Sequence, residues 1–304
     1  MRFLFACGGT AGHVNPAVGV AGRIRELLPE SEILFIGALG KMEMELVPRE
    51  GYEIRGVPVS NLSRSLSAEG IRHNIKFVSD LIKSGPACRK IIEEFKPDVV
   101  IGTGGYVCYP VLHEAAKLGI PTVVHESNAE PGLTTRQLEK CVDKIMVGFA
   151  EARENYKHPE KVVVTGTPVR GDFFIKTKEQ AKEALGVNDG RPLIFSFWGS
   201  LGSGAMNRAM AEFLALESAK EPFHHIHGVG EICWKSMQQW MHDDGLEITE
   251  HPALDVREYI YNMASVMRAA DLVICRAGAS TLSELTALGV PAILVPSPNV
   301  TNHH

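Results

Sequence analysis

The chain has 304 residues, which at about 150 residues per domain predicts two domains. Hydrophobic residues make up 45% of the chain and charged residues 22%, and the mean hydropathy is near zero. This balance excludes a disordered or collagen-like chain. The formal net charge of −5 lacks the overall basic field of a nucleic-acid-binding protein, so we expect no nucleic-acid partner.

The cysteines and the N-terminus indicate the compartment. Six cysteines are scattered without C-x-x-C spacing, which predicts reduced thiols in a cytosolic setting. The opening MRFLFACGGTAGH has a single basic residue and a short apolar run, so it is not expected to be a signal peptide. No stretch reaches the ~20 apolar residues of a membrane span.

In the first half, short apolar runs alternate with longer amphipathic segments. The first run is followed by a Gly-rich turn and a helix at 17–28. This alternation predicts βαβ units and a parallel sheet covered on both faces. The expected strands are residues 2–7, 32–36, 99–101, 122–125, 144–147 and 162–165.

The pattern restarts at residue 192, with a strand at 192–198, a Gly-rich turn and a helix at 206–216. Further strands are expected at 224–228, 272–275 and 292–295. We therefore predict an α/β protein of two doubly wound domains, at 1–165 and 190–304, joined by a linker at 166–189. Because the chain stops directly after a strand, we expect the second domain to be truncated.

Glycines mark the turn after the first strand, CGGTAGH, Cys7 to His13. Glycine permits positive φ and close backbone approach, and free N–H groups at a helix start favour an anion. The motif is neither a Walker loop nor a dinucleotide fingerprint. A tight turn without a ligand is the alternative. His13 ends the turn, either facing a substrate or capping the helix.

Two further loops follow strands of the same predicted sheet. GTGGYVCYP spans 102–110 and HESN spans 125–128. Because ligands bind at the carboxyl ends of parallel strands, we expect these loops and the first turn to converge. Together they supply polar groups suited to acid–base chemistry, with ordinary loop residues as the alternative. The candidates are His13, Tyr106, His125, Glu126 and Asn128.

The second half holds two further helix starts. GSLGSGAMN at 199–207 is a second candidate phosphate cradle, and CRAGASTLSEL at 275–285 starts a helix after a strand. Ser280 or Thr281 is expected to cap that helix, and Glu284 either binds a ribose diol or belongs to a capping box. Arg170 either binds a phosphate or is solvated.

No metal site is predicted, because neither H-E-x-x-H nor a Cys/His quartet nor D-x-D occurs. Neighbouring histidines in the strand at 224–228 face opposite ways, which disfavours a chelate. One helix remains ambiguous: its apolar residues repeat at helical spacing with basic neighbours, which is typical of interfacial helices and of helices that pack on a sheet. The repeat includes Ile71, Ile75, Val78 and Ile82.

Taken together, these motifs resemble the MurG family of UDP-N-acetylglucosamine:lipid I transferases of bacterial peptidoglycan synthesis. Each motif is weak alone, but they occur in family order over essentially the whole chain. They are GGTAGHVNPA (8–17), GTGGYVCYP (102–110), HESNAEPG (125–132), TGTPVRGDF (165–173), WGSLGSGAMN (198–207) and the segment 275–304.

The resemblance implies a GT-B fold, two Rossmann-like domains facing a cleft. It implies metal-independent, inverting transfer of GlcNAc from UDP-GlcNAc to the muramoyl C4 hydroxyl of lipid I, with no cofactor. The implied partners are UDP-GlcNAc, lipid I, an anionic membrane surface and other cell-wall synthesis proteins. The implied location is peripheral, at the cytoplasmic face of the bacterial plasma membrane, with the helix at 71–82 as a candidate docking patch.

The resemblance also assigns roles to residues. His13 is the first choice for the general base and Glu126 the second, while Gly104, Gly105 and Tyr106 would face the acceptor. The implied donor contacts are Thr10, Ala11, Gly12, Asn128, Arg170, Ser200, Ile260, Arg276, Ala279, Ser280, Thr281, Leu282, Ser283 and Glu284.

Two departures from the family pattern matter. Trp198 stands where the family commonly has glycine, and the chain ends Asn302-His303-His304 where a glutamine that reads the sugar is expected. The alternatives are therefore an inactive, truncated UDP-sugar-binding module and a related GT-B transferase acting on another lipid.

Overall fold

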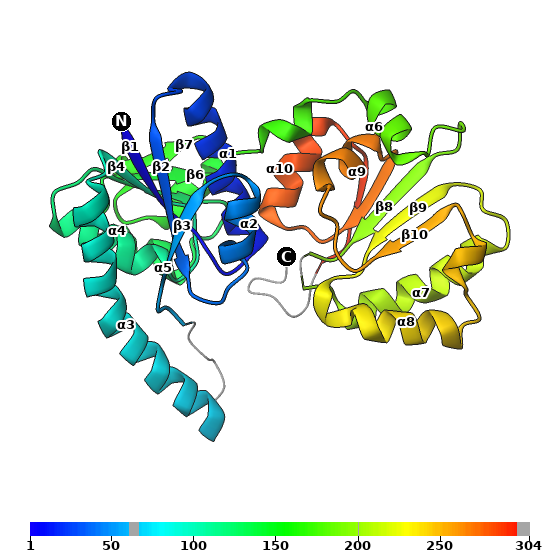
Figure 1. The fold of residues 1–304 in the computed structure, drawn as a ribbon, viewed down its shortest axis with the longest axis horizontal. Coiled ribbons are helices and arrows are strands. Elements are labelled where there is room, and N and C mark those ends of the chain that lie inside the picture. The colour runs from blue at the N-terminus through cyan, green and yellow to red at the C-terminus, as the bar shows by residue number, and fades with distance from the viewer. Residues whose placement is uncertain (61–66, 200, 297–304) are drawn as a thin grey trace. The chain divides into compact units, whose positions relative to one another are not determined.

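The computed structural model describes residues 1–60, 67–199 and 201–296, without the side chains of 68–74, 76–79, 81 and 82. The chain forms two compact units, Met1–Arg170 and Gly171–His304, hereafter the first and second unit. Each is a parallel sheet with helices on both faces, as predicted (Figure 1).

The first unit is built on a seven-stranded parallel sheet of order β3-β2-β1-β4-β5-β6-β7. The order reverses between β1 and β4, and the carboxyl ends of these two strands flank the crevice where open α/β sheets bind ligands. The strands are β1 Arg2–Ala6, β2 Glu32–Ala38, β3 Glu53–Val57, β4 Val99–Gly102, β5 Thr122–Glu126, β6 Lys144–Val147 and β7 Val162–Val164.

Alternate residues of β1 enter different cores. Leu4 and Ala6 pack into the cluster under α3, α4 and α5, whereas Phe3 and Phe5 pack into the cluster under α1 and α2. The central strands are therefore apolar on both faces, which is why they read as continuous apolar runs. The helices are α1 Ala11–Leu27, α2 Glu43–Arg49, α3 Ala68–Phe95, α4 Cys108–Lys117, α5 Leu133–Leu138, η1 Ala150–Asn155 and η2 Pro159–Lys161.

Helix α3 carries the candidate membrane patch. Its carboxyl part packs on α4, and its amino part extends beyond the sheet (Figure 1). The side chain of Ile75 is 66% exposed. Those of Ile71, Val78 and Ile82 lie outside the described residues. Among the described residues, no helix is long and apolar enough to cross a bilayer.

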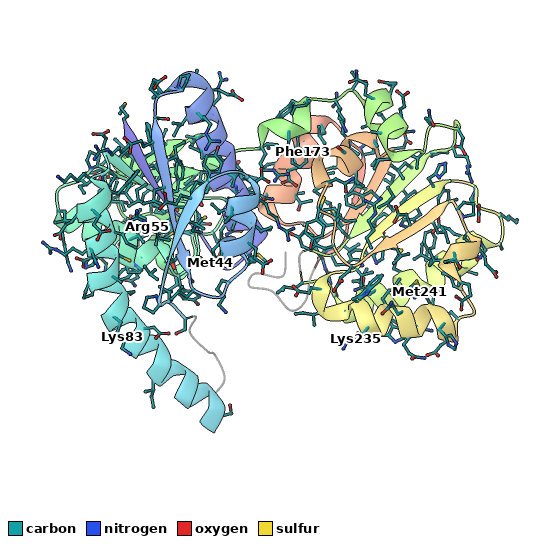
Figure 2. All side chains as sticks on the ribbon, in the orientation of Figure 1. Met44, Arg55, Lys83, Phe173, Lys235 and Met241 are labelled. Atoms are coloured by element: carbon teal, nitrogen blue, oxygen red, sulfur yellow. The ribbon has the colours of Figure 1, made fainter. Side chains whose placement is uncertain are left out.

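The second unit repeats the topology in a five-stranded parallel sheet of order β10-β9-β8-β11-β12. Phe173, labelled in Figure 2, is buried in η3, which contacts α9 and α10. The elements are η3 Gly171–Phe174, α6 Lys178–Leu185, β8 Leu193–Phe197, α7 Gly204–Ser218, β9 His224–Gly228, η4 Glu231–Cys233, α8 Trp234–Asp243, η5 Ile248–Glu250, β10 Leu254–Arg257, α9 Met263–Ala269, β11 Leu272–Cys275, α10 Ala279–Leu288 and β12 Ala292–Leu294.

The structure adds two strands that the sequence did not predict, β3 and β10. Each is the edge strand beside the second strand of its unit, and each mixes polar with apolar residues (EIRGV and LDVR), so neither gives a continuous apolar run. Helix α1 starts at Ala11 rather than at 17, because Gly12, which belongs to the predicted turn, and Pro16 both lie inside it.

Candidate functional site

Three helices start at the carboxyl edges of the two sheets: α1, α7 and α10 directly follow β1, β8 and β11. Among the described residues, the N-cap residue of each makes no side-chain capping hydrogen bond, and no acidic residue lies in its first turn. Helix α6, away from these strand ends, has a complete capping box from Thr177 and Gln180. Uncapped helix starts direct N–H groups and the positive end of the dipole toward a ligand.

In the first unit, the glycine-rich turn already holds a carboxylate. Glu43, fully buried at the start of α2, accepts hydrogen bonds from Gly9 N (3.0 Å) and Ala38 N (2.9 Å). Gly8 N donates to Gly104 O. A Cβ at Gly8 would lie 2.2 Å from Glu43 Oε1, so only glycine fits there. The expectation of free N–H groups is therefore wrong for Gly8 and Gly9, because the protein satisfies them itself.

The same turn sets the tautomer of His13. The Nδ1 of this half-buried ring lies 2.9 Å from the carbonyl oxygen of Gly8 and 3.3 Å from Thr10 Oγ1. Because a carbonyl only accepts, we infer that Nδ1 carries the proton. In the neutral ring Nε2 is then the proton acceptor, which is the form a general base requires.

The loop after β4 packs directly on the first turn. Gly104 and Gly105 have φ of +118° and +89°. A Cβ at Gly104 would lie 2.4 Å from the His13 ring, and one at Gly105 would lie 2.2 Å from Gly8 O. Both glycines are thus required by close approach as well as by backbone conformation.

Cys108 and Thr103 hold this loop in place. Cys108 Sγ is fully buried within 3.1 Å of Ala6 O and 3.0 Å of Gly104 O, and burial raises the pKa of this thiol to about 12, so it stays protonated and donates. Thr103 Oγ1 donates to His13 O over 2.7 Å. The loop after β4 therefore fixes both ends of the turn that carries His13.

Glu126 organises the loop after β5. It accepts four hydrogen bonds, from Asn128 N, Asn128 Nδ2, Gly132 N and Thr135 Oγ1, at 2.7–3.1 Å. The side chain is 7% exposed. Both carboxylate oxygens of Glu126 accept hydrogen bonds from the turn that leads into α5. This geometry suits a residue that holds Asn128 in place.

The other first-unit candidates are spread over the carboxyl edge and the end of the unit. His125 is fully buried with Nε2 3.0 Å from Gly166 O, and burial lowers the pKa of its ring. Tyr106 is 37% exposed. Arg170, largely buried, pairs with Glu50 over 2.6 Å.

In the second unit, the loop after β8 packs on the loop after β9. A Cβ at Gly202 (φ +80°) would lie 2.2 Å from Val229 O, and one at Gly230 would lie 2.3 Å from Gly202 N. In the first unit, the turn after β1 packs on the loop after β4, where the strand order reverses. In the second unit, the corresponding neighbour across the reversal is β11, but the loop after β8 packs on the β9 side instead.

Arg276, directly after β11, contacts the loops that follow β8 and β12. It donates to Ser203 Oγ (3.0 Å) and to the carbonyl oxygens of Val295 and Pro296 after β12. Its guanidinium lies 5.9 Å from the ring centroid of Trp198, a cation–π contact. Arg276 thus connects the loops that follow three neighbouring strands.

Helix α10 begins at Ala279 with Gly278 at the N-cap and no side-chain cap. The expectation that Ser280 or Thr281 caps it is wrong, because both lie inside the first turn. Glu284 is 7% exposed, and Ser283 Oγ donates to Ala279 O. Leu282 lies in the same helix, half-buried.

The remaining donor candidates occupy several places. Ile260 is 5% exposed and packs on Gly228 at the end of β9. In the first unit, Thr10 is the exposed N-cap of α1, and Ala11 and Gly12 form its first turn. Ser200 lies outside the described residues.

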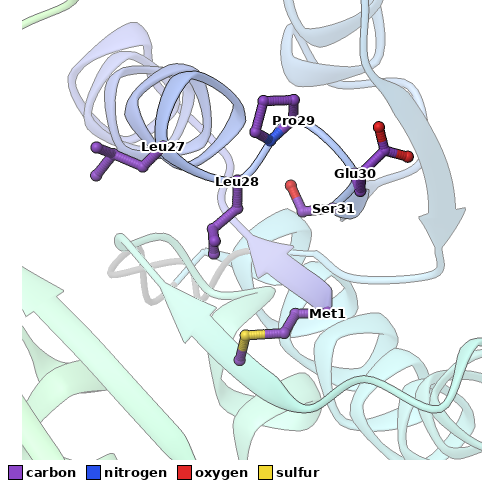
Figure 3. Close-up of a pocket in the computed structure, with 6 residues that line it drawn as sticks. All are labelled: Met1, Leu27, Leu28, Pro29, Glu30 and Ser31. Carbon is purple, nitrogen blue, oxygen red and sulfur yellow. The ribbon is translucent and has the colours of Figure 1, made fainter.

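A shallow apolar pocket lies elsewhere in the first unit. It is lined by Met1, Leu27, Leu28, Pro29, Glu30 and Ser31 (Figure 3). These residues surround the amino ends of β1 and β2, opposite the edge where α/β sheets bind ligands. In the part of the chain that the structure describes, no three His, Cys, Asp or Glu side chains are grouped to hold a metal ion.

Sequence reasoning missed Glu43 and Cys108. Glu43 stands in the run MEMEL, where spacing gives no sign that one carboxylate turns inward. Cys108 lies inside a quoted motif, but its thiol contact with Ala6 O depends on the register between β1 and β4. Both act across elements distant in sequence, and no local pattern reports such contacts.

Comparisons with known proteins agree with this architecture. Residues 3–147 match the glycosyltransferase family 28 N-terminal domain, and residues 193–304 match its C-terminal domain. A crystal structure of Acinetobacter baumannii MurG aligns over 100% of this chain and 80% of its own, with TM-score 0.64 and 28% identity. UDP-GlcNAc 2-epimerase from Neisseria meningitidis, bound to UDP-GlcNAc, aligns over 99% and 84% with TM-score 0.66; at 16% identity it shows the fold alone.

Curated relatives carry a more specific name. "UDP-N-acetylglucosamine--N-acetylmuramyl-(pentapeptide) pyrophosphoryl-undecaprenol N-acetylglucosamine transferase" of Acetivibrio thermocellus is 42% identical over 304 residues, which is 100% of this chain and 80% of the relative. The protein of the same name from Listeria welshimeri is 40% identical and is covered to 81%. The resemblance drawn from the motifs is confirmed: the chain belongs to this family of GlcNAc transferases, with the GT-B fold of glycosyltransferase family 28.

Proposed function

We propose that this chain transfers GlcNAc from UDP-GlcNAc to the C4 hydroxyl of the muramoyl sugar of lipid I, forming lipid II with inversion at the sugar carbon and without a metal ion. The observation that carries the proposal is the 42% identity, over the whole chain, to transferases named for this donor and acceptor. The uncapped helix starts and the tautomer of His13 support it.

We assign binding of the donor diphosphate and ribose to the second unit. The α10 start offers N–H groups to the diphosphate, and Arg276 adds a guanidinium between the β8 and β12 loops. Glu284, one turn into α10, would accept hydrogen bonds from the ribose hydroxyls. The full donor set is Thr10, Ala11, Gly12, Asn128, Arg170, Ser200, Ile260, Arg276 and residues 279–284.

His13 is assigned the role of general base. Its Nε2 would accept the proton of the C4 hydroxyl while the hydroxyl oxygen forms a bond to C1 of GlcNAc. The bond from C1 to the phosphate oxygen breaks at the same time, and UDP leaves with the electron pair. Fixed N–H dipoles and arginine can stabilise the departing charge because they need little reorganisation.

Glu126 is the alternative base, but its four hydrogen bonds favour a positioning role. A base must present a free lone pair to the acceptor hydroxyl, whereas both oxygens of Glu126 hold Asn128 and the start of α5. We therefore assign Glu126 the role of positioning Asn128. Binding of the acceptor is assigned to Gly104, Gly105 and Tyr106.

The acceptor is lipid-linked, so we propose peripheral binding at the cytoplasmic face of the plasma membrane. The exposed Ile75 on the projecting part of α3 supports a docking patch there, with Ile71, Val78 and Ile82 as its other proposed members. Anionic lipid and other cell-wall synthesis proteins are the proposed partners at that surface.

The first experiment is calorimetric titration of the chain with UDP-GlcNAc, with UDP-glucose as the specificity control and EDTA present throughout. Selective binding in EDTA supports the donor assignment. Transfer of radiolabelled GlcNAc to a lipid I analogue, again with EDTA, then tests the reaction, and the anomeric configuration of the product tests inversion.

Two outcomes would contradict the proposal in different ways. Binding of UDP-GlcNAc without transfer would leave a UDP-sugar-binding module. Transfer to another lipid but not to lipid I would indicate a related GT-B transferase with a different acceptor.

A further inference from the structure

A chain of buried polar side chains crosses the core of the second unit. Ser196 Oγ, in the middle of β8, lies 2.7 Å from His225 Nε2 and 2.7 Å from His227 Nδ1, both in β9. At one end, His225 Nδ1 lies 2.7 Å from Glu217 Oε2; at the other, His227 Nε2 lies 3.0 Å from Asn207 Oδ1. The five side chains are at most 6% exposed.

The hydrogen bonds from His225 to the Val229 carbonyl have a single consistent direction. Asn207 Nδ2 donates to Val229 O over 2.8 Å, so Asn207 Oδ1 must accept from His227 Nε2. Burial, reinforced by neighbouring His225, lowers the pKa of His227 to about 3, so its ring is neutral and Nδ1 accepts from the Ser196 hydroxyl. Ser196 Oγ then accepts from His225 Nε2.

The chain ends at the loop assigned to the donor. Val229 O, which accepts from Asn207, is the atom that a Cβ at Gly202 would approach to 2.2 Å. Asn207 N also donates to Ser203 O at the start of α7. The network therefore fixes the carbonyl group against which Gly202 packs.

We propose that His227 and Asn207 are positioning residues for the donor: the buried network holds the Val229 carbonyl, and through it Gly202 and the start of α7, in the conformation that binds UDP-GlcNAc. This inference rests on the proposed function. None of the five side chains needs to touch the ligand, because they act through the backbone of Gly202.

The sharpest test is Asn207→Asp, which keeps the acceptor for His227 but turns an oxygen toward the Val229 carbonyl. Loss of a buried hydrogen bond and the new repulsion should raise the Kd and the donor KM for UDP-GlcNAc about tenfold, with kcat nearly unchanged. A purely structural role would lower the melting temperature without this split between KM and kcat.

Two substitutions at His227 give a second, independent readout. In His227→Gln the amide N–H can replace Nε2–H and reach Asn207, whereas in His227→Asn the shorter amide cannot. We expect the Kd to stay within about threefold in His227→Gln and to rise about tenfold in His227→Asn. His224→Gln is the matched control, because His224 is on the same strand but pairs with Asp189, outside the network.

The wild-type chain is titrated first, which separates the two claims. A wild-type chain that binds no UDP-GlcNAc overturns the proposed function and the donor role of the network with it. Wild-type binding together with an unchanged Kd in folded Asn207→Asp overturns the positioning role alone. If Asn207→Asp does not fold, equal Kd values for His227→Gln and His227→Asn overturn it.

Discussion

The turn after β1 and the turn after β8 occupy equivalent positions in two sheets of the same topology, yet they differ in what they hold. The first contains a buried carboxylate, Glu43, bound to Gly9 N. Within its described residues, the second contains no acidic side chain and instead has Arg276 bound to Ser203. A like charge repels a diphosphate and a guanidinium attracts it, so the pair predicts a division of labour: chemistry at the first turn and anion binding at the second.

The segments that pack against the two turns also differ. The first is packed against the β4 loop, where the order of its sheet reverses, and this contact orients His13. The second is packed against β9, away from the reversal between β8 and β11. A repeated sequence signature thus gives two sites of different chemistry, because the contacts that complete each turn come from elsewhere in the chain.

The largest expected effect separates catalysis from donor binding. His13→Gln should lower kcat about a thousandfold, the usual loss on removing a general base, and leave the Kd for UDP-GlcNAc unchanged. Transfer assays and calorimetry on the same preparation measure both. His158→Gln, an exposed histidine paired with Glu160, is the control. A matching rise in the donor Kd would mean that the His13 ring itself binds the donor, and the variant would no longer separate catalysis from donor binding.

The second-largest effect is expected from substitution of two glycines that have equivalent close contacts. Gly105→Ala and Gly202→Ala each force a Cβ to 2.2 Å from a carbonyl oxygen at positive φ. The backbone strain alone costs about 1–3 kcal/mol, and the close contact adds to it. We expect Gly105→Ala to lower kcat and Gly202→Ala to raise the donor Kd. Urea unfolding and titration measure the two consequences.

Gly199→Ala is the matched control for this pair. It has φ +83°, and among the described residues no atom lies within 4 Å of the added Cβ, so it carries the backbone strain without the collision. If Gly199→Ala raises the donor Kd as much as Gly202→Ala does, the contact with Val229 is irrelevant to binding.

The carboxylate in the first turn can be neutralised directly. Glu43→Gln keeps one acceptor but directs an NH₂ at either Gly9 N or Ala38 N, so the free energy of unfolding should fall by about 1–3 kcal/mol. We expect kcat to fall about tenfold through displacement of His13, with the donor Kd unchanged. Glu45→Gln, exposed on the same helix, is the control. Tighter binding of UDP-GlcNAc to Glu43→Gln would contradict this prediction, because it would show that the Glu43 carboxylate repels the bound donor.

The sequence predicted the parts of this picture that depend on local pattern. The central strands are apolar on both faces and were found within two residues, and His13 was placed at the end of its turn. The edge strands β3 and β10 were missed because half-exposed strands carry weak patterns. Glu43 and the His225–Ser196–His227 chain were not assigned roles, because they depend on which side chains meet across helices and strands far apart in sequence.

The smallest effect tests the uncapped helix start itself. Gly278 has φ −69° and ψ 136°, which any residue adopts, and in the described part of the chain the atom nearest to a Cβ there is Thr281 Oγ1 at 3.8 Å. Gly278→Ser should therefore form an N-cap and raise the free energy of unfolding by a few tenths of a kcal/mol, about the measured preference for serine over glycine. Its hydroxyl would occupy N–H groups that the diphosphate needs, so the donor Kd should rise about threefold.

Helix α6 supplies the control for that argument. Thr177→Ala removes a cap and should cost about 1 kcal/mol while leaving the donor Kd unchanged. If Gly278→Ser stabilises the protein, Thr177→Ala destabilises it, and only Gly278→Ser weakens donor binding, then the start of α10 serves the ligand rather than the stability of the helix. A Gly278→Ser variant that is more stable and binds UDP-GlcNAc as before would mean that the N–H groups of α10 do not hold the diphosphate, and the anion site would have to be sought at the start of α7, where Arg276 meets Ser203.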